Sequence, residues 1–96
     1  TRRVDLVFGV HYDSDIKLTK YVLLEVITAH PKVLKEPAPS VNVLALADSS
    51  INFAVRPWCK AEDYWAVYFE VMEAVKIALD KAGIEIPYPH QVQIHR

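Results

Sequence analysis

Two largely apolar runs lie in the middle of this chain, separated by only three polar residues. The runs are residues 41–47 and 51–58, with Asp48-Ser49-Ser50 between them, and the second run alternates, with its apolar face at Ile51, Phe53 and Val55. A period of two is typical of half-buried strands, and a short polar connection of this kind predicts a tight turn. The two runs should therefore pair as an antiparallel hairpin. Pro57 cannot donate a ladder hydrogen bond, so the far end of the second strand should be an edge or bend away.

A helical segment is expected on each side of this hairpin. Residues 62–82 form the clearer one, and its predicted core residues recur at spacings of three and four: Trp65, Tyr68, Met72, Val75 and Leu79. The other helix should begin where Asp13 or Ser14 caps it and end before Pro31. Its predicted buried stripe is Ile16, Leu23, Leu24 and Ile27. Gly83 suits the left-handed position that follows a helix.

Extended segments are expected at both ends of the chain. Residues 4–10 alternate like a strand, and residues 84–86 and 91–95 are extended segments separated by the prolines of residues 87–89. The element order is then β-α-β-β-α-β. Right-handed crossovers between parallel neighbouring strands, with the hairpin joining the two halves, predict an α+β ferredoxin-like sandwich with two helices on one face of an antiparallel sheet.

Composition limits the classes to which the chain can belong. Its 96 residues fit one domain, and a net charge of -1 argues against a nucleic-acid binder that uses a broad basic field. Cys59 is the single cysteine, which excludes an internal disulfide framework. The longest strictly apolar run is residues 43–47, whereas a membrane helix needs about 20 apolar residues. Because the chain starts with Thr1, we expect a piece of a longer protein.

Nothing in the sequence converges on a catalytic, metal or cofactor site. The four histidines lack metal-ligand spacing and fit ordinary polar positions: His11, His30, His90 and His95. Asp13 and Asp15 could form an acid/base pair or a cation site, but a helix start favours acidic residues for electrostatic reasons alone. Residues 48–50 fit a turn better than part of a hydrolase triad. No cofactor is expected.

Aromatic residues leave two further possibilities open. RNA-recognition motifs share this topology and stack bases on aromatic rings, but Phe53 shares its face with apolar strand neighbours, which favours core packing. Four aromatic residues within residues 64–69 exceed what one helix face can hold. We expect Trp65, Tyr68 and Phe69 to face the core, and Tyr64 to lie at the surface or a subunit interface.

Three phrases of the sequence together resemble one family. Residues 9–15 read GVHYDSD, residues 48–56 read DSSINFAVR and residues 82–89 read AGIEIPYP. In this order and at this spacing they are similar to the GVxYDSD, SSINF-VR and AGIxxPYP phrases of the small-conductance mechanosensitive (MscS-like) channel family. Residues 1–3 also resemble the lead-in to that family's carboxy-terminal domain. The resemblance extends from one end of the chain to the other.

This resemblance implies a channel domain without enzymatic activity. Residues 1–90 would form a ferredoxin-like cytoplasmic vestibule domain, and residues 91–96 a terminal strand that pairs with its copies in a small barrel. Membrane helices absent from this chain would form the tension-gated pore in the cell (inner) membrane, with this domain on the cytoplasmic side. Seven copies would assemble around a path for ions and small osmolytes, releasing osmotic pressure. Neither a cofactor nor nucleic acid is implied as a partner.

The resemblance also assigns structural roles to individual residues. The strand-to-helix turn would be shaped by Tyr12, Asp13, Ser14 and Asp15, and the hairpin fixed by Ser49, Ser50 and Asn52. Pro87 and Pro89 would redirect the chain toward the barrel. The possible subunit interface comprises Tyr64, Val92 and Ile94. Residues 59–62 depart from the family, whose members often carry a small polar cap there. The alternative function is a free-standing ferredoxin-like module that binds RNA or a small regulatory ligand.

Overall fold

The central hairpin is present in the computed structural model, which describes residues 1–87. Strand β3 (Ser40–Leu46) pairs antiparallel with β4 (Ser50–Arg56), as the sequence predicts. The turn is closed by the Ala47 N–H, which donates to the Ser50 carbonyl at 2.9 Å. The register shifts between Val43 and Ala45, so β3 carries a bulge in the middle of its ladder.

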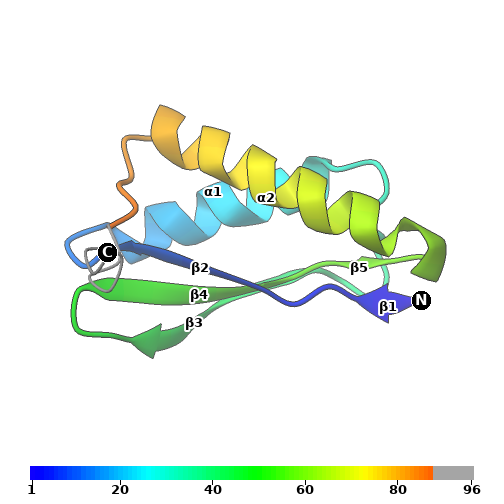
Figure 1. Ribbon diagram of the computed structural model, residues 1–96, viewed down its shortest axis with the longest axis horizontal. Helices are drawn as coiled ribbons and strands as arrows, with labels where there is room; N and C mark the ends of the chain where they lie inside the picture. Colours follow the sequence, from blue (N-terminus) through cyan, green and yellow to red (C-terminus); the bar gives the residue numbers. More distant parts are fainter. Residues whose placement is uncertain (88–96) are drawn as a thin grey trace, which may run out of the picture.

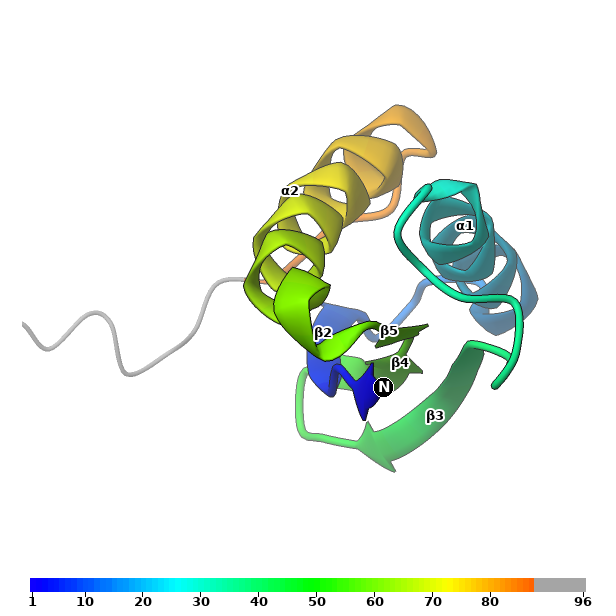
Figure 2. The same ribbon diagram turned by 90° about the vertical axis from the view of Figure 1, so that its right-hand side faces the viewer.

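A third strand completes the main sheet. Strand β2 (Leu6–His11) pairs antiparallel with β4 over its whole length, and the strand order is β2-β4-β3. The prediction that the strands joined by the first crossover are parallel neighbours is wrong, because β4 returns from the hairpin and lies between them. The strand expected at residues 91–95 lies outside the described residues. Figures 1 and 2 show both helices on one face of this sheet, as expected of the α+β sandwich.

A small second sheet holds the amino-terminal residues. Strand β1 (Arg2–Arg3) pairs antiparallel with β5 (Trp58–Cys59), which follows β4 after a break at Pro57. Proline has no N–H to donate, so the ladder stops there, as expected. The Pro57 carbonyl still accepts from the Val4 N–H at 2.8 Å.

Helix α1 (Ile16–Ala29) packs on the sheet through a narrow stripe. Leu23 and Ile27 are fully buried, whereas Ile16 and Leu24 are 40% and 41% exposed, so the prediction that these two belong to the buried stripe is wrong. Leu24 is turned by about 100° from Leu23 around the helix axis, and Ile16 lies at the exposed first turn. The helix ends one residue before His30, and Pro31 follows, as predicted.

Helix α2 (Tyr64–Lys81) follows a single 3-10 turn at Ala61–Asp63, and so begins later than expected. Neither start has a side-chain cap. The residues that face the sheet recur at intervals of four and are fully buried: Val67, Val71, Val75 and Leu79. The prediction that Trp65 and Met72 belong to the core is wrong, since they are 60% and 38% exposed. Tyr68 is partly buried against the core.

The end of α2 is closed by a left-handed glycine, as predicted. Gly83 has a φ of 74° and its N–H donates to the Asp80 carbonyl, while the Ile84 N–H donates to the Leu79 carbonyl at 2.9 Å. These two bonds define a Schellman motif. The chain then returns to the sheet, where the His11 N–H donates to the Glu85 carbonyl at 2.7 Å. Within residues 1–87, no helix combines the length and the apolar character that crossing a bilayer requires.

Candidate assembly surfaces

The turn between β2 and α1 is organised by Asp15. Its backbone is extended, and its carboxylate accepts from the Leu18 N–H at 3.0 Å, which makes it the N-cap. The prediction that Asp13 or Ser14 caps the helix is therefore wrong. Both residues belong to the turn instead, where their N–H groups donate to Nδ1 and the carbonyl of His11. An N-cap carboxylate is explained by helix geometry, so no acid/base pair is needed to account for Asp15.

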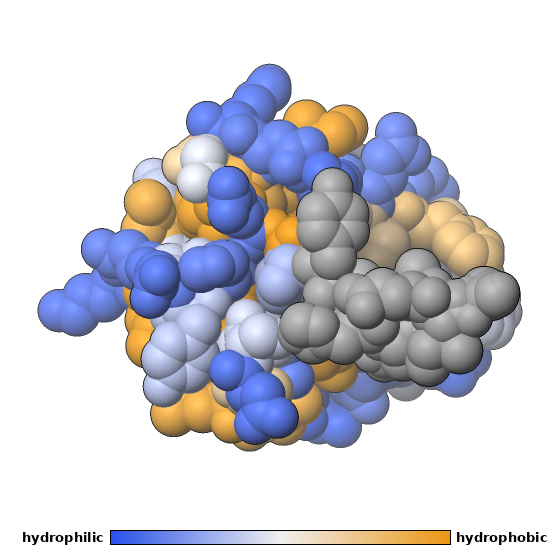
Figure 3. Space-filling model, turned by 60° about the vertical axis from the view of Figure 1, so that its left-hand side comes forward, coloured by the Kyte–Doolittle hydropathy of each residue, from blue (hydrophilic) through white to orange (hydrophobic). Residues whose placement is uncertain are grey.

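Tyr12 lies in the same turn with half of its surface exposed. This end of the molecule, turned forward in Figure 3, shows hydrophilic side chains interspersed with apolar ones. The structure thus places Tyr12, Asp13, Ser14 and Asp15 side by side in one turn. Their part in assembly stays a prediction.

Gly9 of β2 and Asn52 of β4 are complementary neighbours at the end of the sheet that holds the β3–β4 turn. They face each other in the β2–β4 register, and a Cβ added to Gly9 would lie 2.9 Å from Asn52 Oδ1. The same Oδ1 accepts from the Ser50 hydroxyl at 2.9 Å. The missing side chain at Gly9 therefore leaves the space in which this hydrogen bond forms. Ser49 lies in the turn beside them and is exposed.

Replacing Gly9 with alanine should lower the free energy of unfolding by about 0.5–1 kcal/mol, because Asn52 must move and lose its bond to Ser50. In an Asn52→Ala background, the same change should cost nothing or stabilise, since a strand interior prefers alanine to glycine. Urea denaturation of the four members of this double-mutant cycle measures the difference. Identical effects of Gly9→Ala in both backgrounds would contradict the pairing.

Four aromatic rings cluster at the start of α2, but their orientation differs from the prediction. Tyr64 and Tyr68 pack against the core, whereas Trp65 and Phe69 are 60% and 62% exposed. The expectation that Trp65 and Phe69 face the core is wrong. Tyr64 is partly buried, and its predicted place at a subunit interface stays a prediction. The rings of Trp65 and Phe69 stack with centroids 5.8 Å apart. With Met72 these two side chains form an exposed apolar strip, called here the α2 ridge.

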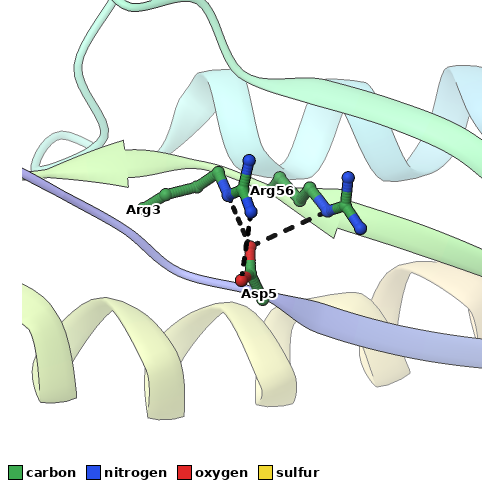
Figure 4. A network of polar contacts seen from close by, with 3 residues as sticks. All are labelled: Arg3, Asp5 and Arg56. Atoms are coloured by element: carbon green, nitrogen blue, oxygen red, sulfur yellow. Dashed lines mark hydrogen bonds and ion pairs between the residues drawn. The ribbon is translucent and has the colours of Figure 1, made fainter.

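Charged side chains tie the amino-terminal strand to the sheet. Asp5 lies between two guanidinium groups, with its Oδ1 2.7 Å from Arg3 Nε and 3.7 Å from Arg56 Nε (Figure 4). All three side chains are roughly half exposed, so each pair adds little to stability. The network carries one net positive charge and joins β1, a residue between β1 and β2, and the end of the central strand β4.

Sequence reasoning missed a contact between His30, the residue that caps the end of α1, and helix α2. His30 Nε2 lies 2.6 Å from Glu70 Oε1 of α2, and His30 Nδ1 accepts from the Lys32 N–H at 3.1 Å. Because Nδ1 is the acceptor, the network assigns the ring proton to Nε2, which donates to the carboxylate. The partners are 40 positions apart, and no local pattern could have indicated the contact.

The described residues show neither an arrangement typical of a metal site nor a reactive cysteine. Among residues 1–87, no three side chains of the metal-ligating types lie close enough to hold an ion. Cys59 is fully buried, and burial, together with the nearby Asp63 carboxylate, raises the pKa of its thiol. A buried thiol with a raised pKa holds little thiolate at neutral pH and is a poor nucleophile.

The remaining predicted site residues lie at or beyond the end of the described chain. Pro87 is half-buried and is the last described residue. Pro89, Val92 and Ile94 fall outside the described residues, as do His90 and His95. The structure therefore brings together the residues of the turn and of the hairpin at one end of the sheet. It places Tyr64 at the opposite end, beside β1.

Comparison with known proteins identifies relatives over nearly the whole chain. The model of a family described as the C-terminal part of the mechanosensitive ion channel MscS matches residues 4–86. A small-conductance mechanosensitive channel of Edwardsiella ictaluri is 44% identical over 94 residues, which cover 98% of this chain and 32% of the relative. An uncharacterized MscS family protein of Synechocystis is 46% identical over 90 residues, covering 94% and 30%. This chain thus spans about a third of the length of these curated relatives.

Solved structures show the same arrangement. The crystal structure of Helicobacter pylori MscS in its closed state superposes with a TM-score of 0.85 at 39% identity, covering 91% of this chain and 35% of that one. A cryo-EM structure of Arabidopsis thaliana MSL1 superposes with a TM-score of 0.67 at 14% identity, covering 93% and 35%. At that identity the second match shows the fold alone.

Proposed function

Because this chain belongs to the MscS family of mechanosensitive ion channels, as its carboxy-terminal domain, we propose that it forms the cytoplasmic vestibule of a tension-gated channel. The observation that carries the proposal is the superposition on Helicobacter pylori MscS, at a TM-score of 0.85 and 39% identity. The expectation that the chain is not an enzyme is confirmed by its membership of a channel family.

In this proposal the domain is a module for assembly and permeation. Residues 1–90 form the wall of the vestibule, and residues 91–96 pair with their copies in a terminal barrel. Membrane helices elsewhere in the parent protein form the pore in the cell membrane. Seven copies surround a path that ions and small osmolytes cross when membrane tension opens the pore. Tyr64, Val92 and Ile94 contribute to contacts between subunits.

The RNA-binding alternative is disfavoured by the placement of Phe53. Its ring is fully buried between the sheet and the helices, so it cannot stack on a base. The near-neutral charge of the chain points the same way. The relatives of known type are channels, and none of the relatives reported above is described as an RNA-binding or small-ligand regulatory protein.

The proposal is tested by patch-clamp recording from cells that lack their own mechanosensitive channels and express the full-length parent protein. We expect suction on the patch to open a current, and cells to survive a sudden fall in external osmolarity. The matched control is the parent protein without residues 1–96, which should assemble poorly and pass no such current. A full-length protein that reaches the membrane but gives no tension-activated current would overturn the proposal. The mass of the purified channel should correspond to seven copies.

A further inference from the structure

Strand β1 has only a small attachment to the domain through its backbone. It consists of two exposed residues and pairs antiparallel with β5, which is equally short. Beyond this pair, the Val4 N–H donates to the Pro57 carbonyl at 2.8 Å. A two-stranded ladder is at best marginally stable in water unless other contacts support it. The side chains of β1 therefore decide how firmly the strand is held.

One side-chain contact joins β1 to helix α2. The guanidinium carbon of Arg2 lies 3.9 Å from the centroid of the Tyr64 ring, well inside the distance of about 6 Å that defines a cation–π interaction. Among residues 1–87, no carboxylate lies within ion-pair distance of Arg2. The aromatic ring thus takes the place of a carboxylate as the partner of this cation. Figures 1 and 2 show the amino terminus beside β5 and near the beginning of α2.

The Tyr64 ring is held in place for this contact. It packs against the core, stacks with Tyr68 at a centroid separation of 6.3 Å and meets Trp65 edge-on at 5.0 Å. The backbone also brings it close, because β5 ends at Cys59 and a single 3-10 turn leads from there to Tyr64. Strand β5 and the ring therefore offer two fixed points of attachment to the same short strand.

The neighbouring arginine makes a contact of a different kind. Successive side chains of a strand point to opposite sides, and Arg3 Nε lies 2.7 Å from Oδ1 of Asp5 rather than over the ring. Asp5 is only two residues away along the chain, so this pair does not by itself fasten β1 to α2. Arg3 is thus a matched comparison for Arg2, with the same residue type on the same strand.

We propose that Arg2 and Tyr64 form a clamp that keeps β1 on the domain, and that Arg2 is thereby a positioning residue of the channel. The inference rests on the proposed function, in which the membrane helices precede this domain in the parent chain. The chain that enters from the pore then meets the vestibule domain first at β1. With the clamp closed, the domain keeps a fixed orientation relative to the part that precedes it. With the clamp open, β1 leaves β5 and the entering chain turns about the buried Val4.

The test is hydrogen–deuterium exchange of the purified full-length channel in lipid nanodiscs, measured at the backbone amides of the β1–β5 pair. Arg2→Met removes the charge, and we expect it to speed exchange about fivefold, as for the loss of one exposed cation–π contact. Arg2→Lys keeps a cation and should stay within about twofold of the unaltered channel. Tyr64→Leu should match Arg2→Met, and the double variant should exchange no faster than either single variant. The matched control, Arg3→Met, should stay within about twofold because it removes only an exposed ion pair.

Three results would overturn the clamp. Unchanged exchange in Arg2→Met would show that the contact does not hold the strand. Effects of Arg2→Met and Tyr64→Leu that multiply in the double variant would show that the two side chains act independently. An equal increase in Arg3→Met would show that any loss of charge on β1 has the same effect.

The positioning role is measured separately by electron paramagnetic resonance. Spin labels are attached at position 17 of α1, where Lys17 is exposed, and at one site in the segment before Thr1, in labelled subunits diluted among unlabelled ones. We expect the distance distribution between the labels to broaden in Arg2→Met and to recover in Arg2→Lys. An identical distribution in Arg2→Met and the unaltered channel would show that the clamp does not position the domain. Tension-activated current in the unaltered channel tests the proposed function independently of the clamp.

Discussion

Replacing Phe53 with alanine should lower the free energy of unfolding by about 3–5 kcal/mol. Phe53 is fully buried in the central strand and faces Phe8 on one side and Val43 on the other. Removing its ring takes away a large apolar surface and leaves a cavity that the two flanking strands cannot close, since their ladders fix their spacing. Urea denaturation followed by circular dichroism measures the change through the midpoint.

Phe69→Ala is the matched control, because it removes the same ring from a side chain that is 62% exposed. We expect a loss below about 1 kcal/mol, limited to the stacking on Trp65 and the edge-to-face contact with Tyr68. Losses of similar size at the two positions would contradict the orientation of α2 described above.

Gly83→Ala should destabilise the chain by about 1–2 kcal/mol, for a reason that lies in the backbone alone. A Cβ at this position would meet nothing within 4 Å, but the φ of 74° is unfavourable for any L side chain. The strain would weaken the two Schellman bonds that end α2 and would loosen the packing of Ile84.

The same denaturation measurement gives the result, with Gly83→Asn as the control. Asparagine tolerates the left-handed region better than alanine, so it should cost less. If alanine were neutral, or asparagine the more destabilising of the two, the left-handed assignment at this position would be wrong.

Features of the fold that depend on local signals could be predicted from the sequence. The hairpin follows from two apolar runs, the second of them alternating, on either side of a three-residue polar turn, and the end of α1 follows from Pro31. The left-handed position after α2 follows from Gly83. In each case a short stretch of chain has few alternative conformations, so the residue types alone decide the outcome.

The side of each helix that packs on the sheet could not be predicted from such local signals. Large aromatic residues suggested that Trp65 and Phe69 face the sheet, but the fully buried side of α2 is a row of valines ending in Leu79. Small β-branched side chains let the helix approach the sheet closely. The sequence of α2 alone does not show that the sheet packs better against this row of valines than against the aromatic rings. The N-cap at Asp15 was missed for a related reason, since several acidic and hydroxyl residues compete there.

Contacts between distant parts of the chain were also beyond sequence reasoning. The pairing of β1 with β5 and the bond between His30 and Glu70 join residues that share no local pattern. Both contacts lie outside the main sheet. The candidate assembly surfaces were the hardest part to predict. The exposure of Trp65 and Phe69 depends on the rotation of α2 about its own axis, which no local pattern indicates.

The bulge in β3 has a consequence for the proposed assembly, in which several copies of this domain would lie close together. β3 is the outermost strand on its side of the described sheet, and its register shifts between Val43 and Ala45. A regular edge would offer an unbroken row of backbone donors and acceptors to a neighbouring copy, which is how strands recruit one another into aggregates. The interrupted row cannot template a continuous ladder. In the proposed assembly, neighbouring copies would therefore avoid pairing through their edge strands and would meet through their side chains.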